Sequence, residues 1–210
     1  ALAVQNFTSS TDANNVAVGS SAGGAITTGT HNTLIGGLAG DAITTGTYNN
    51  AIGYQALSSN TTASFNVANG HYALFANTTG ADNTAVGVGS LGANTTASNN
   101  TAIGRLALGA NTTGTGNVAV GSGASDANTD GDSNIAVGVG ALGSDTRGNF
   151  STAIGHAALN SQNTTNDTDM YNTAVGYLAG TLVTTGVQNT LIGGLAGDAI
   201  TTGNNNVAVG

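Results

Sequence analysis

The chain has 210 residues and a formal net charge of −8, and it contains no Cys, Pro, Trp, Lys or Glu. With Arg105 and Arg147 as its only fixed cations, it is poorly suited to a phosphate backbone or an anionic membrane. The absence of Cys excludes disulfides and thiolate metal sites, and the richness in Gly, Asn, Thr, Ser and Ala favours turns and short strands over helices.

Residues 1–14 come before the first recurring motif, and we expect them to form a lead-in with a shortened first turn. The chain begins with Ala and ends inside a copy of that motif. We therefore expect it to be a fragment of a longer fibre.

From Asn15 to Gly210 the motif Asn-x-Ala-Val/Ile-Gly returns, in forms such as NVAVG, NTLIG, NNAIG and NTAIG. The interval between successive copies is 17 residues, except for one of 21 between Gly155 and Gly176. A fixed period of this length is typical of solenoids. The extra four residues fall within the unit 151–171 and are expected to form an insertion.

We number each unit from its Asn as position 1. Positions 2 to 4 suit a short strand, with positions 2 and 4 on one face and position 3 on the other, while Gly at position 5 and the Thr-Thr-Gly near position 14 suit turns. The sequence therefore predicts an all-β parallel β-solenoid, or β-roll, of about twelve 17-residue units over residues 15–210. Turns stacked about 4.8 Å apart would make a rod roughly 55 Å long.

Positions 9 and 12 vary together. Where position 9 is Gly, as at Gly40, position 12 is Ile or Val, as at Ile43. In five units position 9 is Leu and position 12 is Asn or Asp: these have Leu57, Leu74, Leu91, Leu108 and Leu142. Close packing would impose this exchange if both positions filled one volume. We also expect the Val and Ile residues of the strand to lie in the interior. Apart from these and the one large residue, each unit offers mostly Ala and Thr, which is a thin core. We therefore expect several chains, three by preference, to share a core.

Aromatic residues recur at position 6, as Tyr54 and His71, and at position 17, as Tyr48 and Phe65. Stacked units would bring each pair together, as a stripe suited to sugar rings or to protein, or as a ladder that stabilises the rod. The Thr pairs at positions 13 and 14 would form files of hydroxyl groups, which leaves an ice-binding surface as an alternative.

Asp126, Asn128, Asp130 and Asp132 alternate around Gly131, like the first half of a calcium loop. The bidentate Glu that completes such a loop is missing, since Val137 stands there. The segment is therefore a candidate Ca²⁺ site or a solvated acidic turn. Asp167 and Asp169 lie in the insertion, which is a candidate ligand-binding loop or a tolerated bulge. No grouping of carboxylates and bases suggests an enzyme.

The units NTAVG and NTAIG, each followed by Ala, resemble the head repeats of trimeric autotransporter adhesins (YadA-like heads). The longer stretches NNAIGYQALSSNTT and NVANGHYALFANTTG are similar to repeats of phage tail-fibre-like and adhesin-like fibres. These resemblances imply a left-handed β-roll, a homotrimer, and exposure on a cell or virion surface.

On these grounds we expect a structural or adhesive fibre segment, head or shaft, that attaches a cell or particle to a surface. A phage receptor-binding shaft is the alternative in the same class, and an ice- or glycan-binding solenoid is the alternative in another. The expected partners are two further copies of the chain and an unidentified receptor, glycan or matrix protein, with neither nucleic acid nor membrane insertion.

Overall fold

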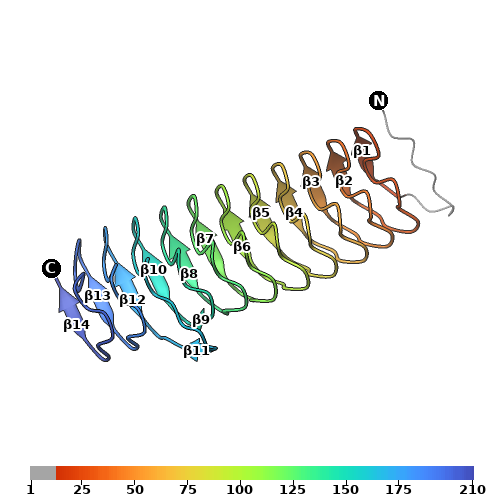
Figure 1. Cartoon of the computed structure of the whole chain (residues 1–210). Helices are drawn as coiled ribbons and strands as arrows, with labels where there is room; N and C mark the ends of the chain where they lie inside the picture. Colours follow the sequence, from red (N-terminus) through yellow and green to blue (C-terminus); the bar gives the residue numbers. More distant parts are fainter. Residues whose placement is uncertain (1–12) are drawn as a thin grey trace.

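The computed structural model describes residues 13–210, so the expected lead-in falls almost wholly outside the described residues. The described chain is all-β, and its turns stack one after another into a rod (Figure 1). Neighbouring turns are related by 17 residues, as in the parallel pairing of Ala102 with Ala119. The predicted parallel β-solenoid is therefore confirmed.

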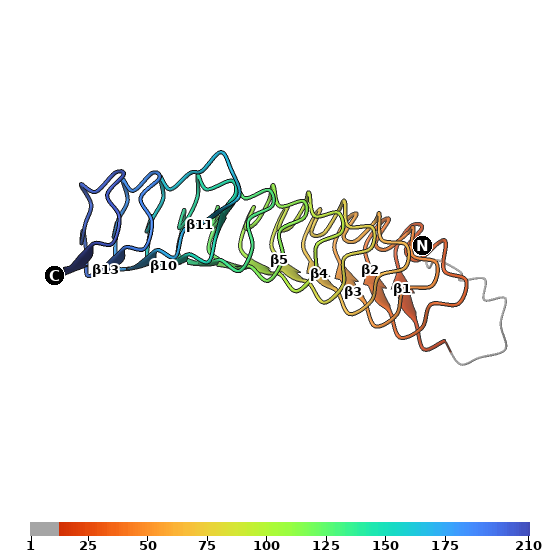
Figure 2. The same cartoon turned by 90° about the horizontal axis from the view of Figure 1, so that it is seen from below.

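Twelve strands of three residues form one sheet in which each strand pairs with the next one of the main series. They are β1 (Val16–Val18), β2 (Thr33–Ile35), β3 (Asn50–Ile52), β4 (Val67–Asn69), β5 (Thr84–Val86), β6 (Thr101–Ile103), β7 (Val118–Val120), β8 (Ile135–Val137), β10 (Thr152–Ile154), β12 (Thr173–Val175), β13 (Thr190–Ile192) and β14 (Val207–Val209). Two shorter strands, β9 (Gly148–Asn149) and β11 (Thr168–Asp169), pair separately beside the insertion. Figure 2 shows the bulge that the chain makes near β11.

Each ordinary turn contains one strand, although its contour length would allow two or three. The backbone reason is a set of residues with positive φ at positions 7, 9 and 17, such as Leu106 (56°), Leu57 (57°) and Tyr48 (57°). Left-handed residues reverse the chain locally and cannot continue a strand. The remainder of each turn is therefore a series of bends whose backbone groups bond to the next turn, as Leu57 N–H does to the Ala73 carbonyl at 3.0 Å.

Gly at position 5 is required by the stacking itself. Gly36 has φ of 139°, and a Cβ atom there would collide with the carbonyl oxygen of Gly53 in the next turn. The same φ range and the same collision recur at the position-5 glycines along the rod, for example at Gly104 and Gly121. A side chain at this position would push neighbouring turns apart.

The interior is built from position 3, position 8 and one larger residue. Ala102 and Ala107 are fully buried, and so is Leu108 at position 9. The Val and Ile residues of the strands, which the sequence reading placed inside, face outward instead: Ile103 keeps 41% of its surface exposed. Position 3 points inward because the narrow interior accepts Ala on the concave side of the strand, which leaves positions 2 and 4 on the outer face.

The exchange between positions 9 and 12 is confirmed as competition for one volume. A Cβ atom on Gly197 would lie 3.1 Å from Cδ1 of Ile200 at position 12 of the same turn and 2.6 Å from Cδ2 of Leu191 at position 3. Gly at position 9 thus leaves room for Val or Ile at position 12. Leu34 and Leu191 at position 3 are fully buried and occupy the rest of the space beside such glycines.

The Asn at position 1 uses one end of its amide within its own turn and the other to bind the next turn. Asn32 donates from Nδ2 to the Gly46 carbonyl at 2.9 Å, and its Oδ1 accepts the backbone N–H of Asn49 at 2.9 Å. Asn32 and Asn49 are almost completely buried, and a buried backbone N–H needs such a partner. This contact explains why Asn recurs at the start of the motif.

A second file of amides runs inside the rod at position 12. Asn94 donates to Oδ1 of Asn77 at 2.9 Å, and Asn111 donates to Oδ1 of Asn94 at 3.0 Å. Each also donates to a carbonyl of its own turn, as Asn94 does to Ala97 at 3.0 Å. The position-12 Asn is therefore not a surface residue but a fully hydrogen-bonded interior one, which offsets the cost of its burial.

Candidate functional site

The outer face of the twelve-stranded sheet carries a row of Val and Ile side chains. Position 4 is Val or Ile in every strand of this sheet except β4, where it is Asn69. Val18 in β1 is 44% exposed and Val209 in β14 is 76% exposed, so the row extends from one end of the rod to the other. Positions 2 and 4 carry no charged residue in any of these strands. A stripe of this extent on one face is the mark of an interaction surface.

Two aromatic clusters lie near β3 and β4, where the sequence predicted ligand-binding residues. At position 17, the Tyr48 ring stacks on His31 with centroids 4.6 Å apart and on Phe65 with centroids 5.2 Å apart. At position 6, Tyr54 stacks on His71 at 5.7 Å, while Tyr72 at position 7 meets Phe75 at position 10 edge-on at 5.1 Å. The structure therefore brings Tyr48 to Phe65 and Tyr54 to His71, as expected from stacked units.

The stacking determines what these rings can offer to a ligand. Tyr48 lies between His31 and Phe65 with interplanar angles of 11° and 5°, so both of its faces are covered by neighbouring rings. Its exposed surface is therefore mainly ring edge and hydroxyl. Sugar rings pack against aromatic faces, so this arrangement favours the stabilising ladder over a saccharide platform. The same parallel stacking joins Phe150 to Tyr171 at 5.3 Å.

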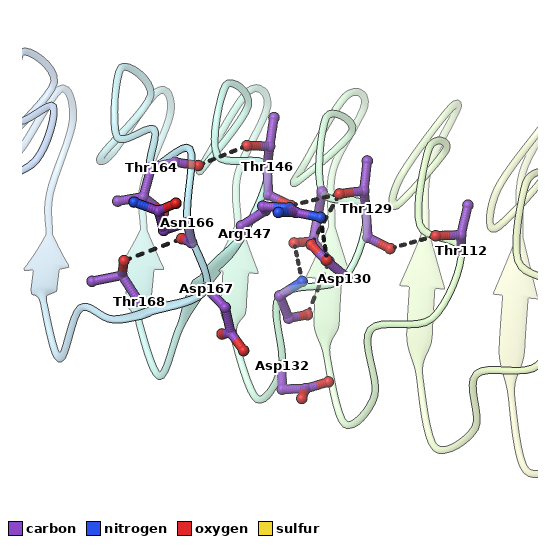
Figure 3. A network of polar contacts seen from close by, with 12 residues as sticks. Thr112, Thr129, Asp130, Asp132, Thr146, Arg147, Thr164, Asn166, Asp167 and Thr168 are labelled. Carbon is purple, nitrogen blue, oxygen red and sulfur yellow. Dashed lines mark hydrogen bonds and ion pairs between the residues drawn. The ribbon is translucent and has the colours of Figure 1, made fainter.

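The four residues of the candidate calcium loop are used in different ways, and Figure 3 shows two of them, Asp130 and Asp132. Asn128 is buried in the amide file and donates to Asn111 Oδ1 at 2.9 Å. Asp130 forms an ion pair with Arg147 at 3.0 Å, and Asp132 accepts the backbone N–H of Thr115 at 2.6 Å. Asp126 is half-buried, and burial raises the pKa of its carboxyl group.

Among residues 13–210, no three His, Cys, Asp or Glu side chains are grouped so that they could hold a metal ion. The arrangement of Asp126, Asn128, Asp130 and Asp132 therefore offers no support for the expected Ca²⁺ site. Each of Asn128, Asp130 and Asp132 already has a partner within the rod. The Ca²⁺ site and the partly solvated acidic turn both stay predictions for this segment.

In the insertion, Asp167 and Asp169 both accept hydrogen bonds from the side-chain amide of Asn149. Asn149 donates from Nδ2 to Oδ1 of Asp167 at 2.5 Å and to Oδ1 of Asp169 at 3.3 Å. Tyr171 donates to Asp169 at 3.2 Å, and the charge of that carboxylate raises the pKa of the Tyr171 hydroxyl. Met170 is fully buried. These contacts anchor the insertion on the preceding turn, so it is an ordered bulge.

The Thr residues at positions 13 and 14 have different surroundings. Thr95 at position 13 is half-buried and donates from Oγ1 to the Thr112 carbonyl at 3.1 Å, a contact that recurs along the rod (Figure 3). Thr96 at position 14 is exposed. Exposed Thr occupies position 14 in six successive turns, at Thr28, Thr45, Thr62, Thr79, Thr96 and Thr113. One file of hydroxyl groups, rather than two, thus faces the solvent.

The sequence analysis missed a buried polar group at the insertion. Asp145 takes position 12 in the amide file with 2% of its surface exposed, and Gln162 in the next turn donates to its carboxylate. Gln162 also donates to Ser151 Oγ at 3.0 Å and accepts from Asn172 at 2.9 Å. The sequence carried a signal of this contact. Ser151 replaces the usual Asn at position 1 in the one unit whose position 12 is Gln162, the longer amide.

No family model, curated protein or solved structure matches this chain. The described residues contain no helix that is long and apolar enough to cross a membrane. The fold and the surface therefore define the chain as a β-solenoid repeat protein with one apolar sheet face.

Proposed function

We propose that the chain is a segment of a homotrimeric extracellular fibre, head or shaft, that holds a cell or particle to a surface. The observation that carries the proposal is the uncharged Val/Ile stripe along the outer face of the sheet. Monomeric proteins rarely expose a continuous apolar patch of more than about 300–600 Å². Three copies that turn this face toward a common axis would bury it.

The thin interior supports the same proposal. Most interior positions hold Ala, so a single chain buries little apolar surface for each residue that it orders. Contacts between sheet faces would add the larger Val and Ile side chains to a shared core. A stiff trimer with identical weak sites on three chains would bind a surface through effective concentration rather than through one strong pocket. This role is structural and adhesive rather than catalytic, and it places the chain outside the cell or on a virion.

Analytical ultracentrifugation tests the assembly. We expect the mass of three chains, and we expect Ile103→Asp to give monomers because it places a charge on the apolar face. Thr79→Asp is the matched control, since Thr79 is exposed at position 14 on another side of the turn. A wild-type monomer, or dissociation caused equally by both variants, would contradict the proposal. Retention of the assembled fragment on glycan- and matrix-protein-coated beads then tests attachment.

The exposed position-14 Thr file favours an ice-binding surface as a second candidate function. Six exposed hydroxyl groups in register form a regular row on a rigid scaffold. Thermal hysteresis of the purified chain measures this activity directly. Thr79→Lys in the middle of the file should abolish the hysteresis if this candidate is correct, whereas the fibre proposal predicts no hysteresis in either protein.

A further inference from the structure

The position-4 file has one polar member. Asn69 in β4 is exposed on the outer sheet face, between Ile52 of β3 and Val86 of β5, which are its partners in the sheet. We infer that Asn69 sets the register in which copies of this chain pack against one another. The inference rests on the proposed homotrimer and names the residue that aligns it.

A periodic apolar stripe does not define a register by itself. Moving one copy along the rod by one unit brings Val and Ile opposite Val and Ile again, as in the exchange of Val120 for Val137. At position 4 the buried apolar surface then changes only at the two ends and at Asn69, whereas position 2 exchanges Thr with Val or Ile at some levels and carries no amide outside β3. Some other feature of the face must therefore discriminate between aligned and shifted assemblies.

Asn69 has the chemistry for this discrimination. Within residues 13–210 its side-chain amide has no hydrogen-bond partner, so water satisfies it in the single chain. A sheet-to-sheet contact removes that water, and the amide then needs a donor or acceptor from another copy. In the aligned assembly, the three Asn69 amides meet at one level, whereas a shift by one unit places each against Ile52 or Val86. A single buried Asn aligns coiled coils for the same reason.

Asn50 adds a second amide to the outer sheet face close to Asn69. It is exposed at position 2 of β3, where the other strands carry Val, Ile or Thr, and it lies one turn from Asn69 on the same face. The amides of the outer sheet face are therefore concentrated in two adjacent turns.

A second copy of the chain fits this surface better than an unrelated partner does. Its side chains repeat with the same rise between turns, so the Val and Ile residues remain aligned along the full length of the contact. The face carries no charge that would select an oppositely charged partner. The match in spacing is a property that two identical solenoids share.

The chain has no Cys, so single cysteines report the register of the full chain directly. In Val120→Cys, aligned copies bring equivalent cysteines together and should form interchain disulfides, which require Cα atoms within about 7 Å of each other. Adding Asn69→Val should leave the trimer mass unchanged but lower the disulfide yield about three-fold, as shifted registers become populated. Thr84→Val, which also removes a polar group from this face, is the matched control and should not change the yield.

Moving the Asn should move the register. The first chain keeps Asn69 and carries Val120→Cys; the second carries Asn69→Val, Val86→Asn and Val137→Cys. In a mixed assembly, a shift by one unit aligns Asn69 of the first chain with the Asn introduced at position 86 of the second. The same shift aligns the cysteine introduced at 120 in the first chain with the one introduced at 137 in the second. We therefore expect a disulfide between the two kinds of chain. If instead the mixed assembly forms without this disulfide, or if Asn69→Val retains the full Val120→Cys yield, the register is set elsewhere and the inference is wrong. A monomeric wild-type chain would reject the trimer itself, which is a separate result.

Discussion

A Cβ atom on Gly40 would lie 2.8 Å from the Cδ1 atom of Ile43 and 2.8 Å from Cδ2 of Leu34. These residues occupy positions 9, 12 and 3 of one turn, and together they fill the volume that a single Leu at position 9 fills in other turns. Most turns of the rod thus have one of two alternative interiors. One combines Gly with Ile, and the other combines Leu with Asn.

The two interiors should be interchangeable as sets but not one residue at a time. Gly40→Leu alone should lower the free energy of unfolding by about 1–3 kcal/mol, because the new side chain overpacks the interior. Adding Ile43→Asn and Leu34→Ala should recover most of this loss, since the introduced amide can then join the amide file beside Asn60. Urea unfolding monitored by circular dichroism measures both effects. If the triple variant is no more stable than the single one, the three positions do not share a volume.

Adjacent glycines should differ sharply in tolerance. Gly36→Ala should destabilise the rod by at least about 2 kcal/mol, because Gly36 has φ of 139° and a Cβ atom there would collide with the Gly53 carbonyl. Gly37→Ala is the control, since its Cβ atom would lie 3.4 Å from Tyr54 Cδ2, an ordinary contact. Thermal unfolding of the two variants provides the comparison, and equal losses would show that stacking does not impose Gly at position 5.

Asp145 should make the stability of the rod depend on pH. Burial raises the pKa of its carboxyl group in the folded chain above the ordinary value of 3.8. The folded chain then binds the proton of Asp145 more tightly than the unfolded chain does. The stabilisation of the fold by this proton is fully present below the ordinary pKa and is lost as the pH rises through the raised pKa. At neutral pH the carboxylate has no proton with which to continue the file to Asn128.

Asp145→Asn supplies that donor at every pH. We expect it to raise the free energy of unfolding at pH 7 by about 1–3 kcal/mol, because a neutral amide then replaces a buried carboxylate. The variant should also flatten the stability profile between pH 4 and neutrality. Urea unfolding across this pH range tests the prediction, with Asp198→Asn as the control because Asp198 is exposed. A profile that is unchanged in Asp145→Asn would assign the pH dependence to other groups.

The ring ladder should contribute to stability more than to binding. Tyr48→Ala removes both stacking contacts of the central ring, each worth about 0.5–1.5 kcal/mol. Gln188→Ala changes the same position in a turn whose position 17 carries no ring, and it should be nearly neutral. Thermal unfolding and retention on glycan-coated beads distinguish the roles. Loss of retention with unchanged stability would instead support a binding role for Tyr48.

The sequence alone determined the period, the number of turns and the parallel stacking, because each depends on which residue types recur at which spacing. It also predicted the shared volume of positions 9 and 12 and the neighbours of Tyr48 and Tyr54. These predictions need only that equivalent positions of successive units lie next to each other. They therefore hold whatever path the chain takes within a turn.

The tertiary structure decided which side of the strand faces the interior. Alternation made positions 2 and 4 one face and position 3 the other, but it could not say that Ala102 is inside and Ile103 outside, because hydrophobicity alone favours the reverse. The narrow interior accepts the smaller side chain. The structure also showed that Asn128 turns into the amide file and that Asp145 pairs with Gln162, since both contacts depend on how the bends after position 5 bring position 12 back over the strand.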